Sequence, residues 1–140
     1  MEPLYVLVAG SRKFTDVETM YRVLDGLIDI YRKTTGGYSE VIIVHGGAKG
    51  ADVLADEYAA NRGYKREMYE ADWDLYGFSA GFRRNEKMHK IISSHKNRFV
   101  VCFWHSKEKS KGTAHNFALC KTYNNTLFVW DFYTNQFIQK

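Results

Sequence analysis

The chain has 140 residues, of which 45% are hydrophobic and 16% are aromatic. This length and composition favour one domain with a buried core and exclude an intrinsically disordered chain, while no apolar run approaches the length of a membrane span. The formal net charge of +4 favours an anionic partner, but it does not distinguish a nucleotide from a nucleic acid.

The first predicted unit is a strand, a helix and a second strand. Residues 4–9 form an uninterrupted apolar run, as in a strand that is buried on both faces. Thr15 and Glu18 have the spacing of a capping box, so a helix is predicted from about residue 16 to residue 31. Residues 41–44 are four β-branched apolar residues, and a strand–helix–strand unit of this kind requires a parallel pair of strands.

The stretch after the second strand is the most informative one. It reads His-Gly-Gly-Ala-Lys-Gly-Ala-Asp at residues 45–52, and apolar residues at helical spacing follow to about residue 59. Glycines leave the backbone accessible, and the free N–H groups at the start of a helix attract anions. Lys49 adds a positive charge there. The pattern predicts an anion site, although a tight turn without a ligand has the same pattern.

The middle of the chain predicts a short strand, a helix and a buried strand. Asn-Arg-Gly at residues 61–63 ends the preceding helix, and the short strand lies near residues 65–69. The next helix covers about residues 80–94. Its predicted inward-facing residues are Phe82, Met88, Ile91 and Ile92. Residues 99–104 then form a fourth strand, which is apolar throughout.

The last third of the chain continues the alternation. A lysine-rich loop at residues 106–111 leads to a helix over about residues 112–123 and a fifth strand at residues 126–130. Residues 132–138 are predicted to add an edge strand. The sequence therefore predicts an α/β fold, a single Rossmann-like doubly wound domain over residues 1–140 with a largely parallel sheet of about five strands flanked by helices.

Ligands of such sheets bind beyond the carboxyl ends of the strands. Three of these ends are followed by glycine together with polar residues: Gly10-Ser11-Arg12, residues 45–52 and Gly112-Thr113. Three loops of this kind at one edge of a sheet favour a ligand site over ordinary turns.

Five motifs carry a resemblance to a known family: VAGSR (8–12), HGGAKGAD (45–52), ADW (71–73), AGFRRNEKM (80–88) and KGT (111–113). In this order they resemble the YspA-like family of the SLOG superfamily, small proteins common in bacteria and phages, over nearly the whole chain. The superfamily includes the Lonely Guy phosphoribohydrolases, the DNA-processing protein DprA and sensor domains for nucleotide-derived signals. The resemblance implies a Rossmann-like fold and a nucleotide or nucleotide-sugar ligand.

Phosphate-binding roles are expected in all three loops. The glycines of residues 45–52 would let backbone N–H groups reach a phosphate. The cations expected to neutralise it are Arg12, Lys49 and Arg84, with arginine favoured for bidentate contacts. Thr113, at the start of the last helix, would offer its hydroxyl and its N–H group.

Three other side chains have two alternative predicted roles each, one in contact with a ligand and one without a ligand. Asp52 accepts from a ribose hydroxyl or caps its helix, and Asn85 contacts a base or sugar or is solvated. Trp73 stacks on a base or belongs to the core or an interface. The ligand-binding residues predicted together are Gly10, Ser11, Arg12, His45, Gly46, Gly47, Lys49, Gly50, Asp52, Trp73, Arg84, Asn85, Lys111, Gly112 and Thr113.

The resemblance also gives a test of catalysis. The phosphoribohydrolases have an arginine four residues before a methionine, which Arg84 and Met88 match, and a later Gly-Thr followed after two residues by a catalytic glutamate. Here Asn116 stands at the glutamate position, and an amide cannot act as a general base. The catalytic residues therefore stay unassigned, with Arg84, Asp52 and Asn116 as candidates. A carboxylate from another loop is the alternative, supplied by Asp52, Asp72 or Asp74.

Three functions remain open. The first is a sensor or sequestering protein that binds a nucleotide-derived small molecule. The second is a nucleotide N-glycosidase or phosphoribohydrolase with a displaced carboxylate, and the third is a binder of single-stranded nucleic acid. A homodimer is a further alternative, since relatives with this fold often dimerise.

No cofactor or metal is expected. The cysteine and histidine side chains near the last helix do not have the spacing of a zinc site, and the two cysteines lie in apolar surroundings, as reduced thiols do. The first residues lead almost directly into a strand, so the sequence predicts a cytoplasmic protein without a signal peptide or membrane contact.

Overall fold

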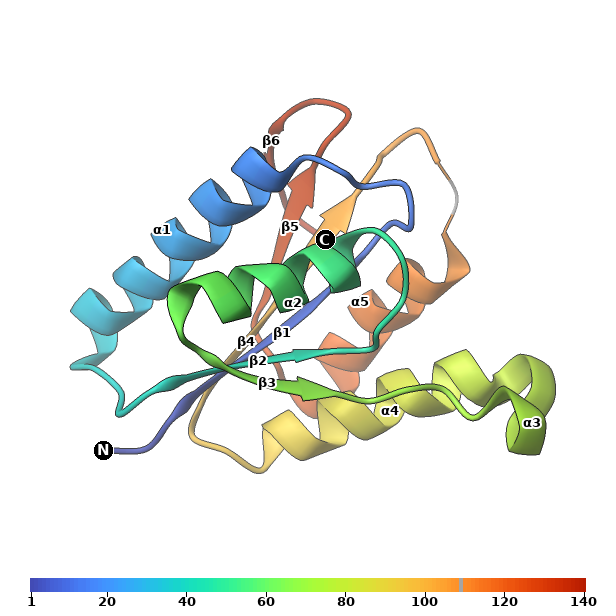
Figure 1. Ribbon diagram of the computed structural model, residues 1–140, viewed down its shortest axis with the longest axis horizontal. Coiled ribbons are helices and arrows are strands. Elements are labelled where there is room, and N and C mark those ends of the chain that lie inside the picture. The colour runs from blue at the N-terminus through green and yellow to red at the C-terminus, as the bar shows by residue number, and fades with distance from the viewer. Residues whose placement is uncertain (109) are drawn as a thin grey trace.

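A central sheet lies between two layers of helices in the computed structural model, which describes residues 1–108 and 110–140 (Figure 1). Within these residues the sheet has six strands: β1 (Leu4–Gly10), β2 (Val41–His45), β3 (Lys65–Met68), β4 (Asn97–Trp104), β5 (Leu127–Asp131) and β6 (Gln136–Ile138). The helices are α1 (Val17–Thr35), α2 (Ala51–Arg62), α3 (Trp73–Tyr76), α4 (Ala80–Ser93) and α5 (Lys111–Tyr123), with a short 3₁₀ turn, η1 (Gly77–Ser79), between α3 and α4. Lys109, part of the predicted lysine-rich loop, lies outside the described residues.

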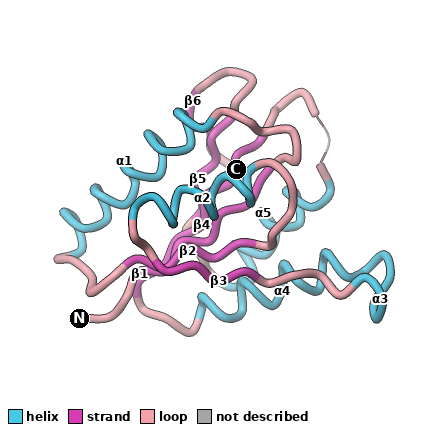
Figure 2. Tube along the Cα trace, viewed as in Figure 1, coloured by secondary structure: helices cyan, strands magenta, loops and turns pink. Residues whose placement is uncertain are grey.

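The strand order is β3-β2-β1-β4-β5-β6. The first five strands are parallel, and β6 pairs antiparallel with β5 at the edge. The predicted α/β fold with a largely parallel sheet is confirmed. The predicted count of about five strands becomes six because the tail forms a hairpin with β5 (Figure 2).

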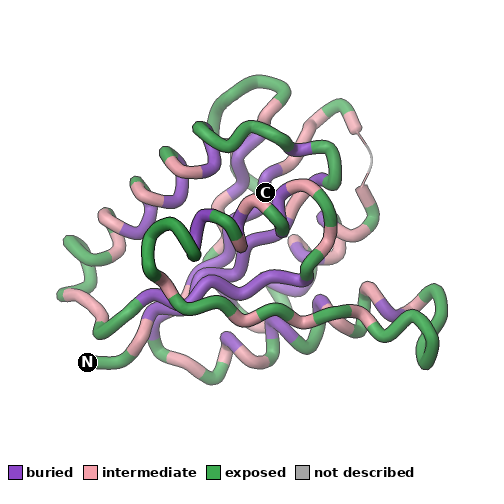
Figure 3. The backbone as a smooth tube through the Cα atoms, viewed as in Figure 1, coloured by how far each residue is buried: buried purple, intermediate pink, exposed green. Residues whose placement is uncertain are grey.

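The helices cover both faces of the sheet and bury it completely at its centre. Leu4, Val6 and Val8 of β1 belong to one core with α1 and α2, whereas Tyr5 and Leu7 of the same strand belong to a second core with α4 and α5. Figure 3 shows the central strands as the most buried part of the backbone. Burial on both faces explains why β1 is apolar at every position rather than at alternate ones.

The start of α1 differs from the predicted capping box. The N-cap is Asp16 rather than Thr15, and its carboxylate accepts from the Thr19 N–H group (3.1 Å) and hydroxyl (2.6 Å). A carboxylate is a strong N-cap because it also carries a negative charge toward the positive end of the helix. The helix runs on to Thr35, beyond the predicted end.

The inward face of α4 is more polar than predicted. Met88 and Ile92 are buried as expected, but Phe82 is 43% exposed. Asn85 and His89 are buried on this face instead. Apolar spacing identified the helix but not its full buried face, because hydrogen bonds compensate the burial of these two polar side chains. Asn85 accepts from the neighbouring Arg84, and His89 is bonded to Asn116 and Asn125, which lie far away in the sequence.

The short helix α3 and the end of α2 both have caps that the local sequence explains. The stretch between the predicted strand near residues 65–69 and the predicted helix from residue 80 contains the short helix α3, which Asp72 caps by accepting from the Leu75 N–H group (3.0 Å). Gly63 ends α2 in the left-handed conformation, as the Asn-Arg-Gly signature predicts. Among the described residues, none of the helices combines the length and the apolar character needed to span a bilayer.

Asp131 fixes the end of β5 to the loop after β4, and we expect it to make stability depend on pH. Burial opposes its charge, but bonds from Ser106, Tyr133 and Thr134 lower the pKa of its carboxyl from 3.8 to about 2. A lowered folded pKa stabilises the protein above the unfolded pKa, and this stabilisation is lost as the pH falls toward 2. Asp131→Asn is therefore expected to lose about 2 kcal/mol at pH 7.

Urea unfolding from pH 7 down to pH 3 tests this, with the gap between variant and wild type shrinking as the pH falls. The matched control is Asp74→Asn, which changes an exposed carboxylate that accepts no hydrogen bond from any described residue. A gap of constant size across the pH range would show that the charge of Asp131 contributes nothing.

Candidate ligand site

A cavity of about 500 Å³ opens at the carboxyl ends of β1 and β4. These strands are neighbours, but β1 continues to β2 on one side of the sheet while β4 continues to β5 on the other. This divergence is the topological switch point at which doubly wound sheets bind ligands. The lining residues come from four segments: Ala9, Gly10, Ser11, Arg12 and Lys13 from the first, Ala48 and Asp52 from the second, Arg84, Asn85 and Met88 from the third, and Glu108, Ser110, Gly112, Thr113 and Asn116 from the fourth.

A smaller chamber of about 220 Å³ adjoins this cavity. We call it the side chamber. It shares Arg12, Ala48 and Arg84 with the main cavity, and its other lining residues are Gly46, Gly47, Glu70, Ala71 and Trp73. The two arginines therefore lie where the two spaces meet.

The structure brings most of the predicted ligand-binding residues together. Those that line the main cavity are Gly10, Ser11, Arg12, Asp52, Arg84, Asn85, Gly112 and Thr113, together with the catalytic candidate Asn116. Gly46, Gly47 and Trp73 line the side chamber. The residues that line neither space are His45, Lys49, Gly50 and Lys111.

The glycine-rich loop before α2 already holds an anion, the carboxylate of Asp52. Its Oδ2 accepts from the N–H groups of Gly46 (3.1 Å) and Ala48 (3.2 Å). Burial raises the pKa of this carboxyl, while those two bonds and the nearby Arg84 act in the opposite direction. Oδ1 accepts no hydrogen bond from any described residue, so one oxygen organises the loop and the other keeps its capacity as an acceptor. Asp52 thus occupies the place at which a phosphate was expected.

His45 has a structural place in the same loop. It is buried, and its Nδ1 accepts from the Gly47 N–H group (3.0 Å). The ring proton is therefore on Nε2, which donates to Asp56 Oδ1 (2.8 Å). This pairing fixes the end of β2 against α2 and leaves the imidazole without a free nitrogen.

Two glycines of the loop are required by protein contacts. A Cβ at Gly46 would lie 2.6 Å from Cζ of Arg84, so the missing side chain makes room for the guanidinium. A Cβ at Gly50, whose φ is +80°, would lie 2.7 Å from Cα of Arg12 and would overlap the Ser11 carbonyl oxygen. That carbonyl also accepts from the Ala51 N–H group (3.2 Å), which joins the loops after β1 and β2.

Arg84 spans the loop and the cavity. Its Nη1 donates to the Gly46 carbonyl (2.6 Å) and its Nε donates to Oδ1 of Asn85 (2.9 Å). Burial lowers the pKa of the guanidinium, Asp52 raises it, and the positive charge of Arg12 lowers it again. Within residues 1–108 and 110–140, neither arginine forms an ion pair with a carboxylate. Two under-neutralised guanidinium groups at one cavity favour an anionic ligand.

Asn116 is tied into a buried amide–imidazole network. Its Oδ1 accepts from Nε2 of His89 (3.0 Å), and its Nδ2 donates to the Gly112 carbonyl (3.2 Å). Nδ1 of His89 in turn accepts from Nδ2 of Asn125 (3.1 Å). Burial lowers the pKa of His89 to about 4, so its ring is neutral at pH 7. Asn116 therefore orients the start of α5, and both ends of its amide are engaged in protein hydrogen bonds.

The carboxylates of the main cavity are Asp52 and Glu108. Glu108 lies 3.8 Å from Nζ of Lys13 in a half-exposed ion pair. The other two candidates from the sequence, Asp72 and Asp74, flank Trp73 and line a separate surface pocket, so they do not line this cavity. In the part of the chain that the structure describes, no three His, Cys, Asp or Glu side chains are grouped closely enough to hold a metal ion.

Several residues that line the cavity were not predicted from the sequence, and Ser110 is the most informative of them. Ser110 is the N-cap of α5, where it accepts from the Thr113 N–H group (3.3 Å) and donates to the Thr113 hydroxyl (3.0 Å). A serine three residues before a buried threonine at a helix start is a capping signal that the sequence contains. Ala48, Lys13 and Glu108 carry no comparable signal.

Gly112 gives a test of where the ligand lies. It lines the cavity, and a Cβ there would meet no atom within 4 Å. Gly112→Ala is expected to stabilise α5 by about 0.5–1 kcal/mol, because alanine is the better helix former, yet to weaken ligand binding about tenfold by filling space in the cavity. Thermal unfolding and calorimetric titration measure the two effects.

The matched control is Gly26→Ala in α1, where a Cβ likewise meets no atom within 4 Å, and Gly26 lines neither the main cavity nor the side chamber. It should give the same gain in stability and leave binding unchanged. Equal affinities of Gly112→Ala and wild type would place the ligand away from α5.

The chain is similar to one protein family, one phage protein and one solved structure. A family model described as "YspA, cpYpsA-related SLOG family" matches residues 4–76. The Gene 61 protein of Mycobacterium phage D29 is 34% identical over 115 residues, which cover 79% of this chain and 82% of that protein. A solved structure described as a predicted subunit of tRNA methyltransferase from Methanocaldococcus jannaschii is 15% identical, with a TM-score of 0.42 over 92% of this chain and 67% of that one.

Proposed function

The chain belongs to the YspA, cpYpsA-related SLOG family, and on this premise we propose that it binds a nucleotide or nucleotide-derived small molecule as a sensor or sequestering protein. The observation that carries the proposal is the main cavity at the switch point, with Arg12 and Arg84 in its wall and no carboxylate paired to either among the described residues. A volume of about 500 Å³ lies within the range of sites that hold a whole small molecule.

The polar groups of the cavity suit the parts of a nucleotide. Arg12 and Arg84 would bind a phosphate, and the free oxygen of Asp52 would accept from a ribose hydroxyl. The N-terminal turn of α5, at Gly112 and Thr113, would add backbone donors and the positive end of the helix dipole. Binding without turnover is favoured because Asn116 replaces the expected glutamate and both ends of its amide are engaged in hydrogen bonds.

Native mass spectrometry of protein purified from cells tests the proposal. The expected result is a bound mass of nucleotide size that is released on denaturation and absent from the Arg84→Ala variant. Calorimetric titration with nucleoside mono-, di- and triphosphates and with dinucleotides then gives the affinities. A protein that carries no such mass and gives no heat with any nucleotide of the panel would refute the proposal.

A second candidate is hydrolysis of a nucleotide N-glycosidic bond. It is favoured by one observation, the presence of the Asp52 and Glu108 carboxylates in the cavity. Chromatography of nucleoside monophosphates incubated with the protein would detect free base. Release of free base that is lost in both Arg84→Ala and Asp52→Asn would establish the hydrolase. If no nucleoside monophosphate releases its base, hydrolysis is excluded for these substrates and the binding function is favoured.

Binding to single-stranded DNA that weakens steeply with salt would indicate a nucleic-acid binder instead.

A further inference from the structure

The main cavity and the side chamber together suggest a more specific ligand. The side chamber measures about 220 Å³, below the lower limit of about 300 Å³ for sites that hold a whole small-molecule ligand. It therefore suits one part of a molecule whose remainder lies in the main cavity. The shared wall of the two spaces, formed by Arg12, Ala48 and Arg84, is where such a molecule would pass from one to the other.

We propose, resting on the proposed function, that the ligand is a dinucleotide in which a pyrophosphate joins two ring systems. The pyrophosphate lies at Arg12 and Arg84, one nucleoside fills the main cavity, and the second ring enters the side chamber and stacks on Trp73.

The charges at the junction support the pyrophosphate. Arg12 and Arg84 are close enough for the charge of one to lower the pKa of the other. Arg84 has five N–H donors and uses Nε and one N–H of Nη1 on protein acceptors, so donors remain for a ligand. A pyrophosphate carries its two negative charges on separate phosphate groups, so each guanidinium can pair with a phosphate of its own, whereas a mononucleotide places a similar charge on one phosphate.

The residues of the side chamber suit a flat ring with an amino or amide substituent. Trp73 is 52% exposed, and its indole rests on α4, where a Cβ at Gly81 would lie 3.4 Å from Cη2. The ring is thus positioned by the helix while it still has open surface to stack on. Glu70, on the same wall, presents a carboxylate that can accept from an exocyclic amino group. Stacking of a base on an aromatic side chain contributes about 1–3 kcal/mol.

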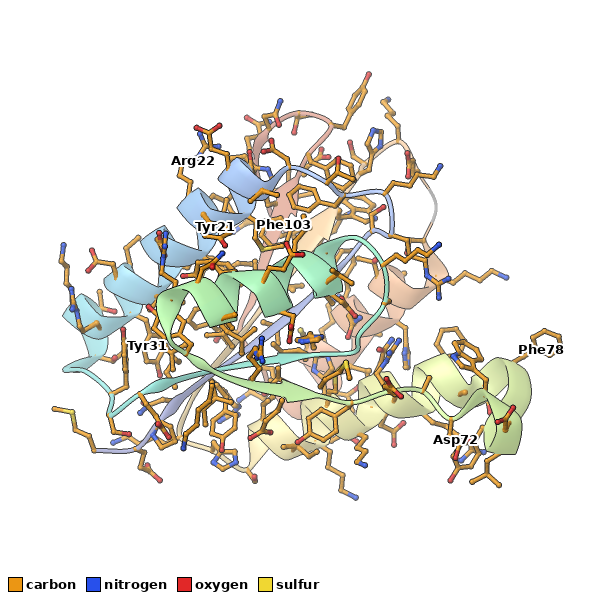
Figure 4. The ribbon with its side chains drawn as sticks, viewed as in Figure 1. Tyr21, Arg22, Tyr31, Asp72, Phe78 and Phe103 are labelled. Carbon is orange, nitrogen blue, oxygen red and sulfur yellow. The ribbon has the colours of Figure 1, made fainter. Side chains whose placement is uncertain are left out.

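The other aromatic residues of this arm, residues 73–82, do not share this placement. Phe78 is fully exposed at the tip of the arm, where Figure 4 shows it directed away from the sheet, and it lines neither space. This makes Phe78→Ala a matched control for Trp73→Ala, because both variants remove an exposed aromatic ring from the same arm.

Calorimetric titration with AMP and with NAD⁺ tests the inference. The wild type is expected to bind NAD⁺ at least about tenfold more tightly than AMP, and Trp73→Ala should remove this advantage while changing AMP affinity less than about twofold. Trp73→Phe should restore most of the preference and Phe78→Ala should keep all of it.

The outcomes separate this inference from the proposed function. Equal affinity for the two probes, or an equal loss for both in Trp73→Ala, overturns the dinucleotide while nucleotide binding stands. If neither probe nor any other nucleotide gives a heat of binding, both the dinucleotide proposal and the proposed nucleotide binding are refuted. Thermal unfolding of each variant confirms that the compared proteins are folded.

Discussion

The Gly50→Ala variant is expected to lose about 2–5 kcal/mol of its free energy of unfolding, a large part of the total of about 5–15 kcal/mol of a typical domain. Two costs add. The backbone at Gly50 has φ +80° and ψ −124°, a conformation that disfavours every residue with a Cβ. The added methyl group would also overlap the Ser11 carbonyl and approach the Arg12 backbone to 2.7 Å or less. Urea and thermal unfolding measure the loss.

Gly63→Ala is the control for this variant. Gly63 also has a positive φ, +71°, but a Cβ there meets no atom within 4 Å. It should cost only about 1 kcal/mol, the conformational part of the effect. Because Gly50 lies where the loop after β2 packs against the loop after β1, Gly50→Ala should also weaken nucleotide binding in the fraction that stays folded. A variant as stable as Gly63→Ala would show that these loops are not in contact.

The Arg84→Ala variant is expected to weaken nucleotide binding about 100-fold, equivalent to about 2.7 kcal/mol. Hydrogen bonds to charged groups contribute about 1.5–3 kcal/mol each, and this guanidinium is held in the wall of the cavity by the Gly46 carbonyl and Asn85. Arg84→Lys should lose about tenfold, because lysine keeps the charge but not the planar arrangement of donors. Calorimetric titration at two salt concentrations gives these values.

The neighbouring Arg83 supplies a matched control. It lies on the same helix, donates from Nε to the Ser79 hydroxyl (3.0 Å) and packs over the Tyr76 ring, outside the main cavity and the side chamber. Arg83→Ala removes the same charge from the protein and should leave affinity unchanged. Similar losses in both variants would mean that net charge, rather than the cavity, attracts the ligand, as in a nonspecific polyanion binder.

The fold and the edge of the sheet that carries the site could be predicted from local pattern. The apolar runs of β1, β2 and β4 and the helical spacing between them required a parallel sheet, and a parallel sheet places the loops after these strands at one edge. Arg12 and Thr113 were predicted as members of one site on this basis, whereas Arg84 was added by the resemblance to a known family. The structure lines one cavity with all three.

The roles of Asp52, Gly46 and Asn116 could not be predicted in the same way. A glycine-rich turn looks alike whether a phosphate or a carboxylate of the protein fills it, and only the folded loop places Asp52 Oδ2 on the Gly46 and Ala48 N–H groups. Likewise, the missing side chain at Gly46 was attributed to a ligand but makes room for Arg84, 38 residues away in sequence.

By itself the sequence determined the α/β class, the order of the elements and the edge at which the site lies, because these depend on periodicity and chain connection between neighbouring elements. Only the tertiary structure decided which groups are free for a ligand. That outcome depends on hydrogen bonds between residues that are distant in sequence, such as His89 with Asn116 or Ser11 with Ala51. A local sequence pattern does not show which donors and acceptors such bonds occupy.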